Sequence, residues 1–156
     1  MANSRPGDKG LTSLPGGKQV SKTDPRIRAL AALDELTCAL GMARALLLRA
    51  KKSGLASEIA QIQEDIIILC GVVAGFPAET EIENRFLRLE NNLAKLPPIS
   101  KPQFMIPGDT LEEAAIHCAR AKCRTAETLI CALRGQDAVK KYTNRLSLFL
   151  FRIVCD

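Results

Sequence analysis

Apolar residues recur along this chain at spacings of three and four, the period of an amphipathic helix, rather than at every second position. Glycine, proline and short polar runs divide this repeat into successive segments. Five helices are predicted, over residues 25–52, 55–76, 79–95, 110–134 and 137–156. No stretch alternates for long enough to predict a strand, so the expected fold is all-α, a five-helix bundle with short loops.

Capping residues support two of these helix starts. Asp24 precedes Pro25, an N-cap residue followed by proline at the first helical position. Thr110 stands three residues before Glu113, which is the spacing of a capping box. Gly135 follows the same segment and suits a left-handed C-terminal cap. This central segment is therefore expected to form one long helix.

The first predicted helix carries a run of residues at helical spacing that we expect to face the core. The run consists of Ile27, Ala31, Asp34, Cys38, Gly41, Ala45 and Leu48. A lone carboxylate in a buried position is costly, so Asp34 should find a cationic partner.

A charged stripe follows the central predicted helix. Its members are Glu113, His117, Arg120, Arg124 and Glu127. Two arginines one turn apart, with a carboxylate three residues later, suit the binding of phosphate oxygens. The alternative is a solvated face with charge pairs between successive turns, which is the commoner case for an arbitrary helix.

Two segments outside the predicted helices are rich in glycine and proline. Residues 1–24 contain four glycines that let backbone N–H groups approach a ligand, but they lack the Walker A spacing. A frayed tail is the alternative. Residues 96–109 place Phe104 and the two apolar residues after it between prolines, where they either pack on the bundle or face a ligand. We expect a flexible N-terminal segment followed by a helical bundle domain, residues 25–156.

The composition narrows the range of partners. The 156-residue chain has a net charge of +5, which suits a nucleoside triphosphate as well as a nucleic acid or an acidic surface. Aromatic residues make up only 4% and do not interleave with basic ones, so nucleic-acid binding is not expected. The longest apolar run is too short to span a bilayer, and the start lacks the apolar region of a signal peptide. A cytoplasmic protein without membrane contact is expected.

Six cysteines occur in the apolar periodic segments, and none forms a C-x-x-C pair. We interpret them as reduced core residues of a cytosolic protein rather than as disulfides. The single histidine, His117, has no partner at a ligand spacing, so no zinc site is expected.

Five short motifs occur in this chain in the order of one known family. They are Ser4-Arg5-Pro6-Gly7-Asp8-Lys9-Gly10, Asp34-Glu35-Leu36, Phe104-Met105-Ile106-Pro107-Gly108, the set His117, Arg120, Arg124 and Glu127, and Tyr142-Thr143-Asn144-Arg145-Leu146-Ser147. With them the chain resembles the ATP:cob(I)alamin adenosyltransferases of the propanediol-utilisation and mitochondrial type over nearly its whole length.

The resemblance implies a homotrimer of helical bundles with active sites at subunit interfaces. In this family the 5′-deoxyadenosyl group of ATP moves to the cobalt of reduced cobalamin, and triphosphate is released. Magnesium would share the charge of the triphosphate with lysine and arginine. Because the reduced cobalt is the nucleophile, the protein is expected to supply positioning and charge stabilisation.

The same resemblance assigns ATP contacts to individual residues. Those in the N-terminal segment are Ser4, Arg5, Gly7, Thr12, Ser13 and Lys22. Arg124 and Glu127 match contacts from the central helix, and Asn144 matches one from the last helix. A bound ATP would therefore lie against both helices and under the N-terminal segment.

Two further roles follow from the resemblance. Arg120 matches an arginine that pairs with the carboxylate matched by Asp34, and we expect this pair to form between two helices. Such a pair would supply the cationic partner that a carboxylate on a buried face needs. Phe104 matches the aromatic residue that packs under the corrin ring.

Four positions depart from the family pattern. Thr125 stands where a second arginine is usual, Pro6 where threonine is usual, and Leu148 and Asp109 replace an aspartate and a glycine. The triphosphate site would have one fewer fixed cation and a stiffer covering segment. A catalytically weak paralogue that acts as a corrinoid or ATP carrier or assembly subunit is therefore the second hypothesis, and an unrelated helical interaction module is the third. The first hypothesis is an active adenosyltransferase. Its expected associations are with a corrinoid reductase, an adenosylcobalamin-dependent acceptor enzyme and a bacterial microcompartment.

Overall fold

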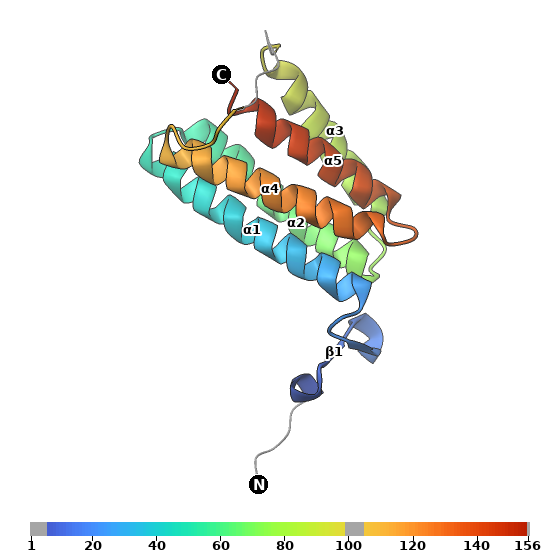
Figure 1. Ribbon diagram of the computed structural model, residues 1–156. Coiled ribbons are helices and arrows are strands. Elements are labelled where there is room, and N and C mark those ends of the chain that lie inside the picture. Colours follow the sequence, from blue (N-terminus) through green and yellow to red (C-terminus); the bar gives the residue numbers. More distant parts are fainter. Residues whose placement is uncertain (1–5, 99–104, 156) are drawn as a thin grey trace.

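A computed structural model describes residues 6–98 and 105–155 of the chain. Its α-helices are α1 (Pro25–Arg49), α2 (Ser53–Ala74), α3 (Glu79–Lys95), α4 (Leu111–Cys131) and α5 (Asp137–Arg152). α1 packs against α2 and α4, while α5 packs against α4 and α3 and closes the arrangement around one core (Figure 1). The predicted five-helix bundle is confirmed. No helix in this described part is long and apolar enough to cross a membrane.

Both predicted helix starts are present. The Asp24 carboxylate accepts a hydrogen bond from the backbone N–H of Arg26 at 2.9 Å. The Thr110 hydroxyl accepts one from the Glu113 N–H at 3.2 Å, and the Glu113 carboxylate accepts one from the Thr110 N–H at 3.4 Å. These two bonds complete the capping box of α4. The helix ends slightly before the predicted position, and Gly135 adopts a left-handed φ of 69° in the turn that leads to α5.

The Glu113 carboxylate also binds the segment that precedes α4. The oxygen that completes the capping box accepts hydrogen bonds from the N–H groups of Asp109 at 2.9 Å and Gly108 at 3.3 Å. The other oxygen lies 3.2 Å from Nε2 of the buried His117. Desolvation acts to raise the pKa of Glu113, but the backbone donors and His117 outweigh it, and the pKa lies below its ordinary value. Glu113 thus fastens this segment to the first turns of α4.

A small hairpin precedes the bundle, and the sequence pattern did not predict it. β1 (Leu11–Ser13) pairs antiparallel with β2 (Gln19–Ser21), after the 3-10 turn η1 (Pro6–Lys9) and around η2 (Pro15–Gly17). Each strand has three residues, too few for an alternating pattern to be recognised. The hairpin projects away from the helices (Figure 1).

The prediction for the buried face of α1 is wrong. Exposed residues of the expected run are Ala31, Asp34, Cys38, Ala45 and Leu48. The face in the core carries Ala29, Ala32, Leu33, Leu36, Ala39, Leu40, Ala43 and Leu47. Alanine and leucine residues of α1 occur on nearly every side of the helix. Periodicity alone therefore did not distinguish the face that packs against α2 and α4. The helix consequently presents a second, outer apolar face.

The prediction for the cysteines is correct in one respect and wrong in another. None of the six cysteines forms a disulfide within the described residues. Only Cys123 is buried, whereas Cys38, Cys118 and Cys131 are exposed. The exposed ones lie on the outward sides of α1 and α4, where small and apolar residues continue beyond the core.

A buried carboxylate joins three helices inside the bundle. Asp65 of α2 is 1% exposed and accepts hydrogen bonds from Arg85 and Arg88 of α3, each at 2.6 Å. It accepts another from the Tyr142 hydroxyl of α5 at 2.5 Å. Burial, and then the negative charge of Asp65, raise the pKa of Tyr142 well above its usual range, so the phenol remains a donor. No local pattern in the sequence predicts this network, since its members are far apart in the chain.

Replacement of Asp65 by asparagine should destabilise the protein strongly. The neutral amide leaves Arg88 without its anionic partner and Arg85 with Glu81 alone, and loss of one partner from a buried ion network costs about 3 kcal/mol or more. Urea denaturation followed by circular dichroism measures the change. As a control, the exposed neighbour Glu64 exchanged for glutamine should alter the free energy of unfolding by less than about 0.5 kcal/mol. Equal stability of D65N and the parent would contradict this role of the network.

The pH dependence of stability should report the Glu113 carboxylate. Because its folded-state pKa lies below the ordinary value of 4.5, its ionised form stabilises the folded protein above that pH. The contribution disappears as the pH falls through the lower folded pKa. Glu113→Gln should therefore lower the melting temperature at neutral pH, and the difference from the parent should shrink in acid below pH 4.5. Thermal unfolding across this range is the measurement, and a difference that stays constant would show that the charge contributes nothing.

Candidate functional site

Four of the predicted site residues line one hollow on the surface between α4 and α5. They are Arg120, Arg124, Glu127 and Asn144. The hollow has a volume of about 670 Å³, which is in the range of small-molecule sites. Ala121, Thr125, Thr128 and Cys131 form the rest of its wall.

Helical spacing explains why these side chains meet. On α4, Arg120, Arg124 and Glu127 follow one another by four and three residues and share one face, while the intervening Cys123 is buried in the core. On α5, Asn144 is exposed and points away from the buried side of that helix. The apolar faces of α4 and α5 pack together and leave their polar residues along a shared groove.

Arg120 is held in place by an aromatic ring. Its guanidinium carbon lies 5.0 Å from the centre of the Phe151 ring of α5, a cation–π contact. Phe151 is not among the predicted site residues. Its position seven residues after Asn144, two turns along the same face of α5, is the signal that identifies it.

The central charges of the hollow are available to a ligand. Within the described chain, none of the ion pairs involves Arg124 or Glu127. The Thr125 hydroxyl, by contrast, donates to the Ala121 carbonyl of its own helix at 3.2 Å. An exposed guanidinium beside a carboxylate and an amide can bind an anion and hydrogen-bond a polar group attached to it.

The structure does not place Asp34 in this hollow. Asp34 is exposed on α1, near Cys70 of α2, whose pKa is raised to about 11 by burial and then by the Asp34 charge. Arg120 faces α5 instead, so the predicted ion pair of these residues does not form within one chain. On the same helix, Glu35 accepts a hydrogen bond from Lys122 of α4 at 2.5 Å.

The predicted N-terminal contacts lie in the hairpin, outside the hollow. Thr12 and Ser13 belong to β1, where they pair with Val20 and Gln19 of β2. Lys22 donates to the Gly7 carbonyl at 3.0 Å and ties the turn before β1 to the residue after β2. The remaining predicted contacts, Ser4, Arg5 and Phe104, lie outside the described residues.

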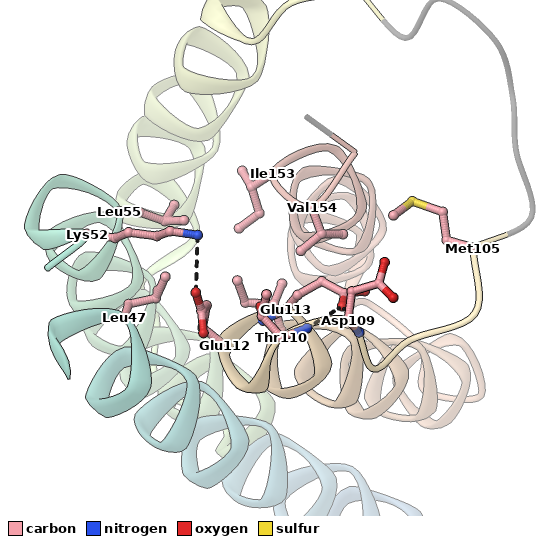
Figure 2. Close-up of a pocket in the computed structure, with 11 residues that line it drawn as sticks. Leu47, Lys52, Leu55, Met105, Asp109, Thr110, Glu112, Glu113, Ile153 and Val154 are labelled. Atoms are coloured by element: carbon pink, nitrogen blue, oxygen red, sulfur yellow. Dashed lines mark hydrogen bonds and ion pairs between the residues drawn. The ribbon is translucent and has the colours of Figure 1, made fainter. Parts of the chain in front are cut away.

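A second, smaller cavity lies at the end of the bundle where α4 begins, and Figure 2 shows its lining. It has a volume of about 250 Å³, and its lining is part polar, with Asp109, Thr110 and Glu113. The apolar part of the lining consists of Leu47, Leu55, Met105, Ile116, Ile153 and Val154. An ion pair of Lys52 with Glu112, at 3.3 Å, borders it (Figure 2). Ile116 precedes Arg120 by one turn, so the two cavities follow one another along α4. The sequence analysis did not predict this cavity, because its lining comes from four separate segments.

The described residues contain no group of three or more histidine, cysteine, aspartate or glutamate side chains placed to hold a metal ion. Glu127 is the carboxylate among the residues that line the hollow between α4 and α5. A divalent ion there would need most of its oxygen ligands from a bound phosphate group and from water.

Comparison with known proteins identifies relatives along the whole chain. The family described as cobalamin adenosyltransferase matches residues 2–155. The chain is 31% identical to a corrinoid adenosyltransferase of Citrobacter freundii, over 94% of this chain and 89% of that protein. It is 32% identical to the human corrinoid adenosyltransferase MMAB, over 94% of this chain and 64% of that protein. It is 28% identical to the corrinoid adenosyltransferase PduO of Citrobacter freundii, of which it spans about half, 47%.

Solved structures with the same fold come from Lactobacillus reuteri. One is an arginine-to-lysine variant of a PduO-type ATP:corrinoid adenosyltransferase complexed with ATP, with a TM-score of 0.77 and 27% identity over 95% of this chain and 89% of that one. Another is a phenylalanine-to-histidine variant complexed with cobalamin and ATP, with a TM-score of 0.77 and 25% identity over 99% of this chain and 89% of that one.

Proposed function

Because the chain belongs to the cobalamin adenosyltransferase family, we propose that it transfers the 5′-deoxyadenosyl group of ATP to the cobalt of cob(I)alamin. The products are adenosylcobalamin and triphosphate. The observation that supports this function most directly is the meeting of Arg120, Arg124, Glu127 and Asn144 at one hollow. The hollow combines fixed positive charge with hydrogen-bonding groups, as a nucleoside triphosphate requires.

The chemistry makes few demands on the protein. Cobalt(I) attacks C5′ of ATP, a cobalt–carbon bond forms, and the bond from C5′ to the triphosphate oxygen breaks with its electron pair on that oxygen. Arg124 stabilises the charge that develops on the leaving group, since its exposed guanidinium forms no ion pair with the residues that the structure describes and can bind that charge. Glu127 and Asn144 orient the nucleotide through hydrogen bonds. A magnesium ion would take most of its oxygen ligands from the triphosphate and from water, and it would share the same charge with Arg124.

Residues 1–24 act as the ATP-binding segment, and residues 25–156 act as the bundle that supports the site. Ser4, Arg5, Gly7, Thr12, Ser13 and Lys22 contribute to this segment. The projection of the hairpin away from its own bundle supports this role, because it allows the segment to reach a nucleotide on another chain (Figure 1).

The active unit is a homotrimer with its sites between subunits. The outer face of α1 supports this assembly, since it exposes Ala31 and Cys38 one turn to either side of Asp34. Asp34 and Arg120 face different sides of one bundle, so their charges can pair only between two chains. Phe104, in the segment that leads to Met105 and the second cavity, packs under the corrin ring.

A catalytically weak paralogue that binds corrinoid or ATP as a carrier is the second candidate. The observation that favours it is Thr125, whose hydroxyl is occupied by the Ala121 carbonyl, so this position offers neither a cation nor a free donor. One assay distinguishes the active enzyme from the carrier. The protein is mixed with ATP, magnesium and chemically reduced cobalamin, and the loss of cob(I)alamin absorbance is followed. Nucleotide binding without turnover would identify the carrier. A cytoplasmic location and docking of a reductase or acceptor enzyme remain predictions.

Arg124→Ala should reduce turnover about a hundredfold. One charge-assisted contact to the leaving group in the transition state is worth on the order of 3 kcal/mol. The cob(I)alamin absorbance assay at saturating ATP measures the loss. Arg134→Ala is the matched control, because this arginine is also exposed but lies outside the residues that line the hollow. It should keep the parent rate. Turnover of R124A within twofold of the parent would remove Arg124 from the site.

Asp34→Asn should weaken the trimer and slow the reaction together. Removing one member of an ion pair that is buried in an interface costs about 3–5 kcal/mol. Sedimentation velocity at decreasing protein concentration, together with the turnover assay, measures both effects. Combination with Arg120→Ala tests the partnership, since a true pair gives a double variant no worse than the poorer single one. Additive losses would show that the two residues do not meet.

A further inference from the structure

Asn144 of the hollow and Tyr142 of the buried network stand two residues apart on α5. Residues two apart on a helix point to nearly opposite sides, so one face of α5 enters the core where the other meets the hollow. Tyr142 is fully buried and Asn144 is exposed. The orientation of α5 about its own axis therefore decides where the Asn144 amide lies.

The Tyr142 hydroxyl has a fixed partner. It donates to Oδ2 of Asp65 at 2.5 Å, and Asp65 is itself held by Arg85 and Arg88 at 2.6 Å. The two arginines belong to α3 and the carboxylate to α2, so the Tyr142 hydroxyl ties α5 to two other helices. A single short hydrogen bond at the end of a rigid ring restricts both the rotation of the helix and its sliding.

A second hydrogen bond holds α5 at the residue directly before Asn144. The Cys123 thiol of α4 donates to the Thr143 carbonyl of α5 at 3.3 Å. Burial raises the pKa of Cys123 to about 12, so the thiol keeps its proton and remains a donor. Cys123 precedes Arg124, and Thr143 precedes Asn144. The bond therefore aligns the two helices at the residues that face the hollow.

We propose that Asp65 and Tyr142 are positioning residues of the nucleotide site, which act through α5 to hold Asn144 opposite Arg124 and Glu127. The proposal rests on the proposed function, since it takes Asn144 as a nucleotide contact. Neither residue touches the hollow. Their effect on the reaction is transmitted by the orientation of a helix.

The test compares Tyr142→Phe, Asn144→Ala and the double variant in the full-length protein. Y142F keeps the ring and removes only the hydroxyl. It should raise the KM for ATP about fivefold, in keeping with the sensitivity of catalysis to small misplacements, while the KM for reduced cobalamin stays within twofold of the parent. In the N144A background, the added Y142F should leave the KM for ATP unchanged. Its effect on the melting temperature should persist in both backgrounds.

A control variant separates positioning from general instability. Ile62→Val removes one methylene from a buried position of α2 and leaves the Tyr142 hydroxyl in place. It should lower the melting temperature without changing the KM for ATP. If Y142F fails to fold, Arg88→Lys supplies the same test, because it loosens Asp65 through a partly exposed side chain.

Each contrary result has a distinct meaning. A Y142F protein with the parent KM for ATP, or one whose KM rises by the same factor in the N144A background, overturns the positioning role and leaves the proposed function intact. An unchanged KM for ATP in N144A alone removes Asn144 from the nucleotide site, and the positioning role falls with it. An increase in KM in I62V equal to that in Y142F would attribute the effect to stability.

Discussion

The Asp65 carboxylate is the constraint on which the rest of the bundle depends. It is buried, and its three hydrogen-bond donors come from α3 and α5. A charge in such a place is tolerated only when its partners are complete, so the three helices must take one relative arrangement. An apolar core alone tolerates small rotations of its helices, because hydrophobic contacts are not directional. The hydrogen bonds of Asp65 are directional, so they restrict such rotations of the helices.

This constraint bears on the site through α5. The buried side of α5 carries Tyr142 and Thr143, and its exposed side carries Asn144 beside the arginines of α4. The Cys123 thiol and the Arg120 contact with Phe151 join the same two helices on either side of that position. The reaction needs no covalent nucleophile from the protein, so its rate depends on where charges and amides stand. A rigid pair of helices is suited to that requirement.

One chain alone brings together only part of the predicted site. Arg120, Arg124, Glu127 and Asn144 share a hollow, whereas Asp34 lies on the outer side of α1 and the hairpin residues Thr12 and Ser13 lie away from the bundle. The outer face of α1 is apolar in a position that the chain itself leaves uncovered. The separation of these residues and the uncovered face of α1 both fit the proposed assembly, in which one chain supplies the charged face of α4 and another supplies the hairpin.

The sequence by itself determined the number of helices, the caps of α1 and α4, the charged stripe of Arg120, Arg124 and Glu127, and the family. Each depends on residues within a few turns of one another, or on short motifs in a known order. The tertiary structure alone decided which face of α1 is buried, which partners satisfy Asp65, and that Asp34 and Arg120 are apart in one chain. Alanine and leucine residues of α1 occur on nearly every side of the helix, so only the contacts with α2 and α4 determine which side is buried. Asp65 and Tyr142 lie 77 residues apart, and no local pattern encodes a hydrogen bond over that separation.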